Sequence, residues 1–377
     1  MAIPPSSRLP DVSRPPFAGA PEARFEPAPA DGVLPEGFFS TSNLPTYVRV
    51  GDRWLMPTRP RMDAVIVRRE GLLETLEPRL VRRGEPVAMG LAEDGTEGIV
   101  VHVEGFLGGA TSPNEFRFMA SEVSRERPVN YDEMAERVES ERRAGGYMVW
   151  VMGPALVHSR ARADLEWFIR EGYVQAVLVG NAVAVHDIEA AIYGTTLGMT
   201  DRGDTTVAGH GSHMRAINKV RAAGSIEAAV ESGLIGRGIM HALVTHRIPY
   251  VLAGSIRDDG PLPGVITDSV TAQDAMRGHT VRATGAVFVA TALHAIAVGN
   301  MLPSFHTHRG APEPLMTICV DQTEFVVSKL KDRGTHQAFA VVTNAQDFMH
   351  ILRLYVEREL DARRTLTPRS VAAVSAR

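Results

Sequence analysis

Residues 174–198, VQAVLVGNAVAVHDIEAAIYGTTLG, decide the fold, because an apolar run ends there at a Gly-Asn turn and a helical pattern begins. The run from Val174 to Val179 is short, β-branched and bounded by glycine, which is typical of a strand buried on both faces of a parallel sheet. Apolar residues recur at helical spacing from Ala182 onward, which predicts Asn181 as the helix N-cap. Ligands bind beyond the carboxyl ends of such strands, although an ordinary strand-turn-helix unit that binds nothing is an equal alternative.

The same alternation extends over the chain from Tyr147 onward. Strand-like runs alternate there with amphipathic helical patterns, and the six runs read YMVWVMG, VQAVLVG, IPYVLAG, GAVFVAT, LMTICVD and AFAVVTN. This alternation predicts an α/β fold with a parallel sheet covered by helices on both faces. Five runs end in a small or polar residue that can face a ligand, namely Gly180, Gly254, Thr291, Asp321 and Asn344. No GxGxxG motif follows any of them, so the standard dinucleotide fingerprint is absent.

The first part of the chain has a different organisation. Nine of the 24 prolines lie in the first 35 residues, and this composition predicts a disordered tail over residues 1–30. Short strand-like pieces, at 46–50, 64–67 and 98–103, then predict a small β-rich domain over residues 31–146, which ends in a linking helix within 130–146. The α/β domain would cover residues 147–363, and residues 364–377 would form a flexible C-terminal tail.

Composition narrows the class of function. The formal net charge is −4 and the basic residues are dispersed, so nucleic acid and anionic membranes are not expected partners. The single cysteine, Cys319, lies in an apolar run, which excludes an intrachain disulfide and favours a reducing, cytoplasmic compartment. No secretory signal opens the chain, and the most apolar window, residues 285–298, is too short for a membrane span. A small-molecule enzyme is the expected class.

Asp321 is the first candidate for cofactor binding. It closes a buried strand, where a carboxylate accepts hydrogen bonds from ribose hydroxyls and disfavours a 2′-phosphate, which favours NAD over NADP. Capping of the following helix at Thr323 and Glu324 explains the same carboxylate equally well.

Two further segments carry candidate chemistry. The loop SIRDDGPLP, residues 255–263, places Arg257, Asp258 and Asp259 after a strand end, where binding residues concentrate. The segment GHGSHMRAIN, residues 209–218, places His213 and Arg215 near a helix start. An arginine can hold a carboxylate with two hydrogen bonds, and a histidine can move protons near neutral pH. No zinc-site spacing and no GxSxG elbow are present, so metal-assisted and hydrolytic chemistry are disfavoured.

A series of motifs in order also resembles a known family. They are LPEGFFSTSNLPTYVRV from Leu34, FRFMASEVSRERPVNY, WVMGPALVHS, REGYVQAVLVGNAVAVHDIE, HMRAIN, VLAGSIRDDGPLPGVITD, LHAIAVGNMLPS and CVDQ. Together they resemble the LOR/SDH bifunctional enzyme conserved region, which is found in archaeal-type ornithine cyclodeaminases and in the C-terminal part of cyanobacterial arginine dihydrolase/ornithine cyclodeaminase fusions. The resemblance implies an NAD-dependent conversion of L-ornithine to L-proline and ammonia. It also implies a Rossmann-like sheet similar to deoxyhypusine synthase, which accounts for an NAD site without GxGxxG.

Matched motif by motif, the resemblance implies NAD contacts at the strand ends: Asn181, Ala182, Asp259, Thr291, Ala292, Leu293, His294, Asp321, Asn344 and Ala345. The chain departs from the family pattern in four places. These are Asn344, where an acidic residue is usual, Thr291-Ala292 in place of Ser-Met, the segment before HMRAIN, and the apparent insertion HTHRGAPEP. The arginine-hydrolysing domain of the fusions is absent, so that activity is not expected.

The implied reaction needs groups that hold the α-carboxylate and move protons. The α-carboxylate would be held by Arg215 or Arg257, and the base would be Asp258, Asp187 or His213. The sequence does not decide between these candidates. The site is not expected to hold a metal ion. The protein is expected to form a homo-oligomer. Two other functions stay open. One is an NAD-dependent dehydrogenase of lysine- or saccharopine-like amino acids, and the other is a non-catalytic NAD-binding regulatory protein.

Overall fold

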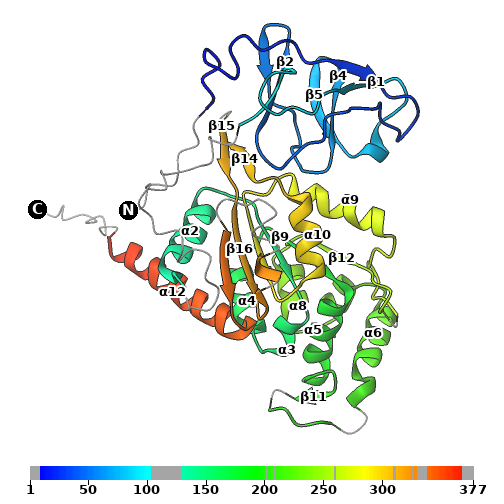
Figure 1. The fold of residues 1–377 in the computed structure, drawn as a ribbon. Helices are drawn as coiled ribbons and strands as arrows, with labels where there is room; N and C mark the ends of the chain where they lie inside the picture. The colour runs from blue at the N-terminus through cyan, green and yellow to red at the C-terminus, as the bar shows by residue number, and fades with distance from the viewer. Residues whose placement is uncertain are drawn as a thin grey trace, which may run out of the picture.

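The computed structural model describes residues 9–102, 129–200, 202–206, 209–258, 260–308, 311–324, 326–328 and 338–366 (Figure 1). Its centre is a six-stranded, fully parallel sheet. In sheet order the strands are β12 (Tyr250–Ala253), β9 (Ala176–Gly180), β8 (Met148–Met152), β13 (Gly285–Val289), β16 (Met316–Asp321) and β17 (Ala338–Val342). Each strand falls in one of the six predicted runs, so the predicted parallel α/β sheet is confirmed.

Side chains of the central strands are buried on both faces, because alternate residues of a strand point to opposite sides. Trp150 and Val177 belong to one hydrophobic core, whereas Val149 and Leu178, each adjacent in sequence to one of these, belong to the other. Cys319 is buried in the second core, and burial raises the pKa of its thiol to about 12. Cys319 is therefore a buried structural thiol, in agreement with its place in an apolar run.

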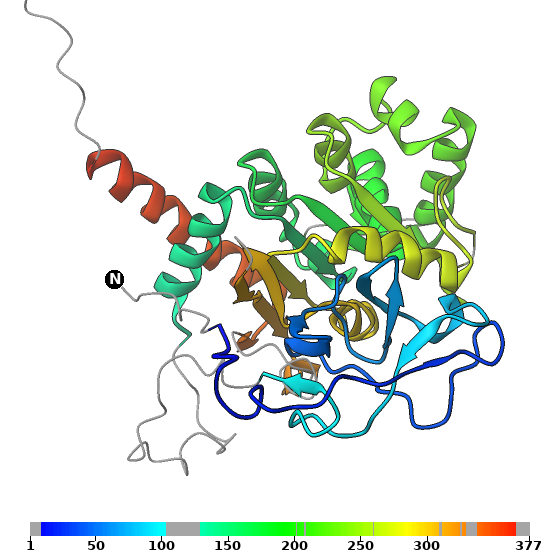
Figure 2. The same cartoon turned by 90° about the horizontal axis from the view of Figure 1, so that it is seen from above.

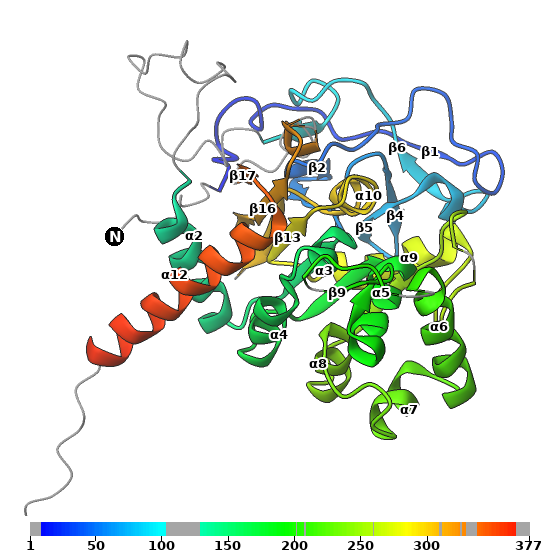
Figure 3. The same ribbon diagram turned by 90° about the horizontal axis from the view of Figure 1, so that it is seen from below.

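Helices cover the sheet unequally. The second core is closed by α9 (Ser269–Thr280) and α10 (Leu293–Met301). The first core is closed by α2 (Tyr131–Arg143), α3 (Ala155–His158), α4 (Arg162–Arg170), α5 (Asn181–Tyr193), α6 (Ser212–Ala223), α7 (Ile226–Glu231), α8 (Ile239–Thr245) and α12 (Ala345–Leu366). Figure 3 shows α6, α7 and α8 grouped at one side and the long α12 at the other.

The N-terminal region is mainly β, as predicted, and lies beside the parallel sheet (Figure 2). It contains two antiparallel sheets, ordered β1-β6-β4-β5 and β3-β2-β7. Their strands are β1 (Phe25–Pro27), β2 (Thr46–Val50), β3 (Arg53–Leu55), β4 (Val65–Arg69), β5 (Leu72–Leu76), β6 (Pro86–Ala88) and β7 (Ile99–Val101), with a short 3₁₀ helix, η1 (Pro78–Leu80).

The predicted disordered tail is wrong for residues 9–30. Phe17 is only 3% exposed, and its ring lies 4.9 Å from Trp54 and 5.8 Å from Tyr47, while β1 pairs with β6. Proline and alanine side chains lose almost no rotamer entropy on burial, so a proline-rich segment with one well-placed aromatic anchor can be ordered. Residues 1–8 lie outside the described part of the chain.

The predicted linking helix also differs from the structure. Helix α2 packs on the α/β body, where the Tyr131 ring lies 6.1 Å from Phe348 and 5.6 Å from Tyr355 of α12. Its Glu139 accepts a hydrogen bond of 2.7 Å from the Tyr173 hydroxyl. The helix therefore belongs to the α/β domain rather than to the N-terminal domain. At the other end, α12 continues past residue 363 to Leu366, and residues 367–377 lie outside the described range.

The N-terminal domain docks near the amino ends of the sheet strands. Helix α10 starts at the carboxyl end of β13 and runs back, and just after it the Ser304 amide donates to the Asn43 carbonyl over 3.1 Å. Glu77 accepts hydrogen bonds from Arg61, Arg79 and, on α9, Arg277. The hairpin of β14 (Phe305–His308) and β15 (Ala311–Pro314), formed by the apparent insertion, also lies against this domain (Figure 1).

Candidate functional site

The candidate residues gather at the carboxyl edge of the parallel sheet. The chain runs outward from β8 to β9 and β12, and then restarts beside β8 with β13, β16 and β17. This is the strand order of the Rossmann fold, and ligands of that fold bind outside the carboxyl ends where the order reverses. The reversal lies between β8 and β13, which places the turns after β8, β9 and β13 around one position.

The backbones of these turns approach closely. A Cβ atom at Gly153, directly after β8, would collide with the carbonyl oxygen of Ala290, directly after β13. Ala290 itself has a φ of +53°, a left-handed conformation that costs a non-glycine residue about 1 kcal/mol or more. Such strain concentrates at functional sites, and here it directs the segment from Thr291 to His294 into the start of α10.

His294 stands on the first turn of α10 and reaches back to β9. A Cβ atom at Gly180 would lie 2.8 Å from Cε1 of its imidazole, so the ring packs directly on the Gly180 backbone. Burial lowers the pKa of His294, and the negative charge of Asp258 acts in the opposite direction. The arrangement gives a neutral imidazole with a carboxylate in its field, which is the arrangement of a proton carrier. The family resemblance implies only an NAD contact for His294, and a role in proton transfer is visible only in this geometry.

The loop after β12 closes on itself. The Ser255 amide donates to Oδ2 of Asp258 over 2.8 Å, and the Asp258 amide donates to the Ser255 carbonyl over 3.1 Å. Arg257 is exposed at the tip, with its amide donating to the Ser255 hydroxyl over 3.2 Å. The third predicted residue of this loop, Asp259, lies outside the described residues.

Asn181 is not the helix N-cap that the sequence predicted. Strand β9 extends to Gly180, which takes the N-cap position, and α5 begins at Asn181. Its side chain is 4% exposed, and Oδ1 accepts a hydrogen bond of 3.1 Å from the Leu262 amide. The asparagine therefore joins the turn after β9 to the loop after β12, with Ala182 beside it in the first turn of α5.

Asp321 and Asn344 lie at the predicted strand ends but make local hydrogen bonds. Oδ1 of Asp321 accepts from the amide and hydroxyl of Thr323, over 2.9 and 2.8 Å, which is the capping alternative. Oδ1 of Asn344 accepts from the Asp347 amide over 2.8 Å, and Ala345 starts α12 in a buried position. The acidic ribose partner of a Rossmann fold follows the second strand, whereas Asp321 ends the fifth, so its assignment to NAD rests on the family resemblance.

Asp187, one of the three predicted candidates for the catalytic base, has structural partners on all sides. Its carboxylate is fully buried, pairs with Nε of Arg162 over 2.8 Å, and accepts from the amides of Ile239 and Met240 over 3.0 and 2.8 Å. It therefore caps α8 and holds α4, α5 and α8 together. The side chain points toward the neighbouring helices α4 and α8, and its residue type alone does not reveal this direction.

His213 and Arg215 lie at the start of α6, after a short 3₁₀ turn, η2 (Gly209–Gly211). The guanidinium of Arg215 lies beside Gly211, and Nδ1 of His213 is buried without a hydrogen-bond partner among the described residues. Figure 1 shows α5, α6 and the hairpin of β10 (Thr195–Thr196) and β11 (Met199–Thr200) at the end of the molecule opposite the N-terminal domain. His213 and Arg215 are thus the second and fourth residues of α6, a helix that packs along α5.

A histidine pair next to the edge was missed by sequence reasoning. The rings of His158, at the end of α3, and His186, on α5, have centroids 4.7 Å apart, and burial with the second ring lowers the pKa of His158. His186 also faces Glu189 at 3.4 Å. Glu189 accepts from Thr195, Leu197 and Gly198, over 3.0, 3.0 and 2.9 Å, and so holds the β10–β11 hairpin. The helical spacing of His186 and Glu189 was the available signal.

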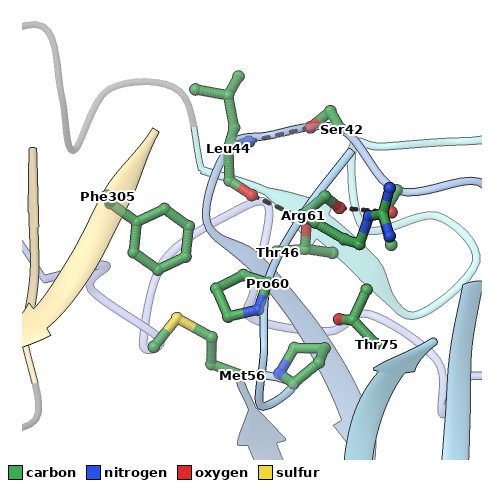
Figure 4. Close-up of a pocket in the computed structure, with 10 residues that line it drawn as sticks. Ser42, Leu44, Thr46, Met56, Pro60, Arg61, Thr75 and Phe305 are labelled. Atoms are coloured by element: carbon green, nitrogen blue, oxygen red, sulfur yellow. Dashed lines mark hydrogen bonds between the residues drawn. The ribbon is translucent and has the colours of Figure 1, made fainter. Parts of the chain in front are cut away.

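A small pocket elsewhere in the molecule is separate from this edge. It lies between the N-terminal domain and Phe305 of β14, and Figure 4 shows Met56, Pro60 and Arg61 around it. Arg61 is paired with Glu77, and the other lining residues are apolar or small hydroxyl side chains. The strand-end site therefore remains the better candidate for chemistry. In the described part of the chain no three His, Cys, Asp or Glu side chains form a metal site, and no helix there is long and apolar enough to cross a membrane.

Comparison with known proteins agrees with this geometry. The family models of the arginine dihydrolase ArgZ-like C-terminal Rossmann fold and of its C-terminal first region match residues 132–352 and 45–132. An ornithine cyclodeaminase from Methanopyrus kandleri is 44% identical over 345 residues, which cover 90% of this chain and 80% of that protein. A protein from Archaeoglobus fulgidus with the same name is 42% identical over 95% of this chain and 82% of its own.

Solved structures give the same result. A conserved LOR/SDH protein from Methanococcus maripaludis S2 is 41% identical and superposes with a TM-score of 0.82, over 90% of this chain and 99% of that chain. The ternary complex of AgrE with ornithine and NAD+ is 35% identical with a TM-score of 0.56, over 91% of this chain and 47% of that chain. A deoxyhypusine synthase from Entamoeba histolytica superposes with a TM-score of only 0.34 at 8% identity, over 56% of this chain and 74% of that chain, which is too low to indicate a shared fold.

Proposed function

The chain belongs to the ornithine cyclodeaminase family with ArgZ-like C-terminal regions, and from that premise we propose that it converts L-ornithine to L-proline and ammonia with NAD as cofactor. The observation that supports this most directly is the packing of the His294 ring on Gly180 at the carboxyl edge of the sheet, with the charge of Asp258 acting on the imidazole. A reaction that combines hydride and proton transfer requires a proton carrier next to the bound cofactor.

The residues at this edge fit a dinucleotide. Helices α5 and α10 both begin there, and neither N-cap residue, Gly180 or Ala292, makes a side-chain cap hydrogen bond. Backbone amides at helix starts suit a pyrophosphate, and the Asp321 carboxylate, assigned to the ribose by the family resemblance, would repel a 2′-phosphate. Asn181, Ala182, Asp259, Thr291, Ala292, Leu293, His294, Asp321, Asn344 and Ala345 are the proposed NAD contacts, and NAD is the proposed preference over NADP.

When bound, NAD supplies a hydride acceptor that is restored within the turnover, so the net reaction is redox-neutral. The residues of this chain do the remaining work. We assign proton transfer to the Asp258–His294 pair, since a neutral imidazole can accept a proton from the substrate amine. Arg257, exposed at the loop tip, is assigned to binding the α-carboxylate of the substrate. Arg215 on α6 is the alternative for this contact.

One assay tests the function. Purified protein, NAD and L-ornithine should give proline and ammonia while absorbance at 340 nm stays level, since the reduced cofactor is consumed within each cycle. A sustained rise in absorbance without proline would instead identify an amino-acid dehydrogenase. NAD binding with neither product would identify a non-catalytic protein. We also expect a cytoplasmic homo-oligomer, and light scattering after gel filtration measures the oligomeric state.

A further inference from the structure

We infer that Arg221 and Asn181 clamp the loop of residues 255–263 at the candidate site, and that Arg221 is a positioning residue for the reaction. The inference rests on the proposed function, because the loop carries Arg257 and Asp258. Arg221 lies near the end of α6, outside every segment to which a role in the site has been assigned.

The first half of the loop needs an external support. The hydrogen bonds that close its turn in the described part of the loop are those among Ser255, Arg257 and Asp258, and Ile256 at the tip is fully exposed. A turn stabilised within four residues keeps its own shape but does not fix its orientation relative to His294. That orientation must come from the points where the loop meets the rest of the molecule.

The second half of the loop supplies two such points. Nη2 of Arg221 donates to the Pro261 carbonyl over 2.8 Å, and the next amide, of Leu262, donates to Oδ1 of Asn181 over 3.1 Å. Leu262 is 3% exposed and packs in the first core, between the sheet and α5 and its neighbouring helices. Gly260 has a φ of +145°, a backbone conformation that favours glycine, and a Cβ atom there would lie in ordinary contact with Nη2, at 3.4 Å.

Both supports belong to one structural unit. Asn181 is the first residue of α5, and α6, which carries Arg221, packs along α5. The same α6 carries Arg215, six residues earlier and about 9 Å along the helix axis. The Arg221–Pro261 hydrogen bond therefore sets the spacing between helix α6 and the turn that carries Arg257 and Asp258. By fixing this turn, it also sets the distance of Asp258 from His294.

The test compares Arg221→Ala and Arg221→Lys with a matched control. Nη2 of Arg237 also donates to a backbone carbonyl, of Ala190 over 3.2 Å, but this pair lies away from the loop. Arg221→Ala should raise deuterium uptake in the peptide of residues 254–262 and lower kcat/KM for ornithine. The expected loss is about fivefold or more, because a hydrogen bond from an exposed charged group lies at the low end of its usual range.

The pattern across variants separates positioning from general stability. The NAD dissociation constant should change less than kcat/KM in Arg221→Ala, since Asp259 is the only one of the ten proposed NAD contacts that lies in the loop. Arg221→Lys, which retains a cationic donor, should recover both exchange and kcat/KM in part, and Arg237→Ala should change neither.

Unchanged deuterium uptake in Arg221→Ala would overturn the clamp, and raised uptake with wild-type kcat/KM would overturn the positioning role. An equal loss of kcat/KM in Arg237→Ala would also overturn it. A wild-type protein that makes no proline would overturn the proposed function instead, and the exchange data would still decide the clamp.

Discussion

The imidazole of His294 lies directly on the backbone of Gly180, so that a Cβ atom at position 180 would be 2.8 Å from Cε1 of the ring. The two residues follow β13 and β9, which are separated in the sheet by β8. His294 therefore reaches across the end of β8 and closes the carboxyl edge at the strand-order reversal.

Gly180→Ala should displace this ring. We expect kcat/KM for ornithine to fall about tenfold or more, because a misplacement of about 1 Å at a catalytic group has effects of this order or larger. Gly278→Ala in α9 is the control, since a Cβ atom there meets nothing within 4 Å and a helical alanine replaces a glycine. Steady-state kinetics of both variants checks the prediction, and equal activity of Gly180→Ala and the control would refute it.

The pH dependence of kcat/KM should report His294. Burial lowers its pKa, so the active neutral form should persist below pH 6.5, and activity should be lost only as the pH falls through the lowered value. Asp258→Asn removes the charge that raises this pKa, so the acidic limb should move to lower pH. His279, whose pKa burial also lowers, pairs with Tyr147 near the amino edge, and His279→Gln should leave the limb in place. An unmoved limb in Asp258→Asn would contradict the pairing.

Asp187→Asn should damage stability rather than chemistry. The variant leaves the Arg162 guanidinium, 17% exposed, without its buried partner, a change that typically costs about 3–5 kcal/mol of unfolding free energy. Urea denaturation should show this loss, while kcat of the folded fraction stays near the wild-type value. Wild-type stability with a collapsed kcat would restore Asp187 as a catalytic candidate.

Phe17→Ala should destabilise the N-terminal domain, in contrast to the expectation from composition that this segment is disordered. The side chain is 3% exposed against Tyr47 and Trp54, and truncation of a buried phenylalanine costs about 3–5 kcal/mol. Val12→Ala, at a position that is 50% exposed, is the control. Thermal unfolding checks both, and similar melting temperatures would show that the segment contributes no core.

Arg257→Ala should separate substrate from cofactor. If Arg257 holds the α-carboxylate, kcat/KM for ornithine should fall by a factor corresponding to about 2 kcal/mol, while NAD affinity stays nearly intact. Calorimetric titration of NAD beside steady-state kinetics measures both quantities. A variant with unchanged kcat/KM would move the carboxylate contact to Arg215.

The sequence by itself determined the sheet. Six apolar runs of four to six strand residues alternate with helical patterns, which made β8, β9, β12, β13, β16 and β17 all predictable. The inner strands are apolar because they are buried on both faces, whereas the edge strand β17 buries Val341 and leaves Val342 55% exposed. Their parallel direction followed from the alternation with helices, and the carboxyl edge followed from the parallel direction. The candidate residues at that edge were identified for the same reason.

Only the tertiary structure decided what the polar residues do. The same carboxylate is a base or a helix cap according to which backbone amides lie opposite it, and for Asp187 these belong to residues more than fifty positions away, Ile239 and Met240. The contacts of His294 with Gly180, of Arg221 with Pro261 and of Phe17 with Trp54 are likewise between distant segments. Composition and periodicity report local preference and burial, whereas hydrogen bonds between distant segments depend on strand order and helix packing, which the chain fixes only when it folds.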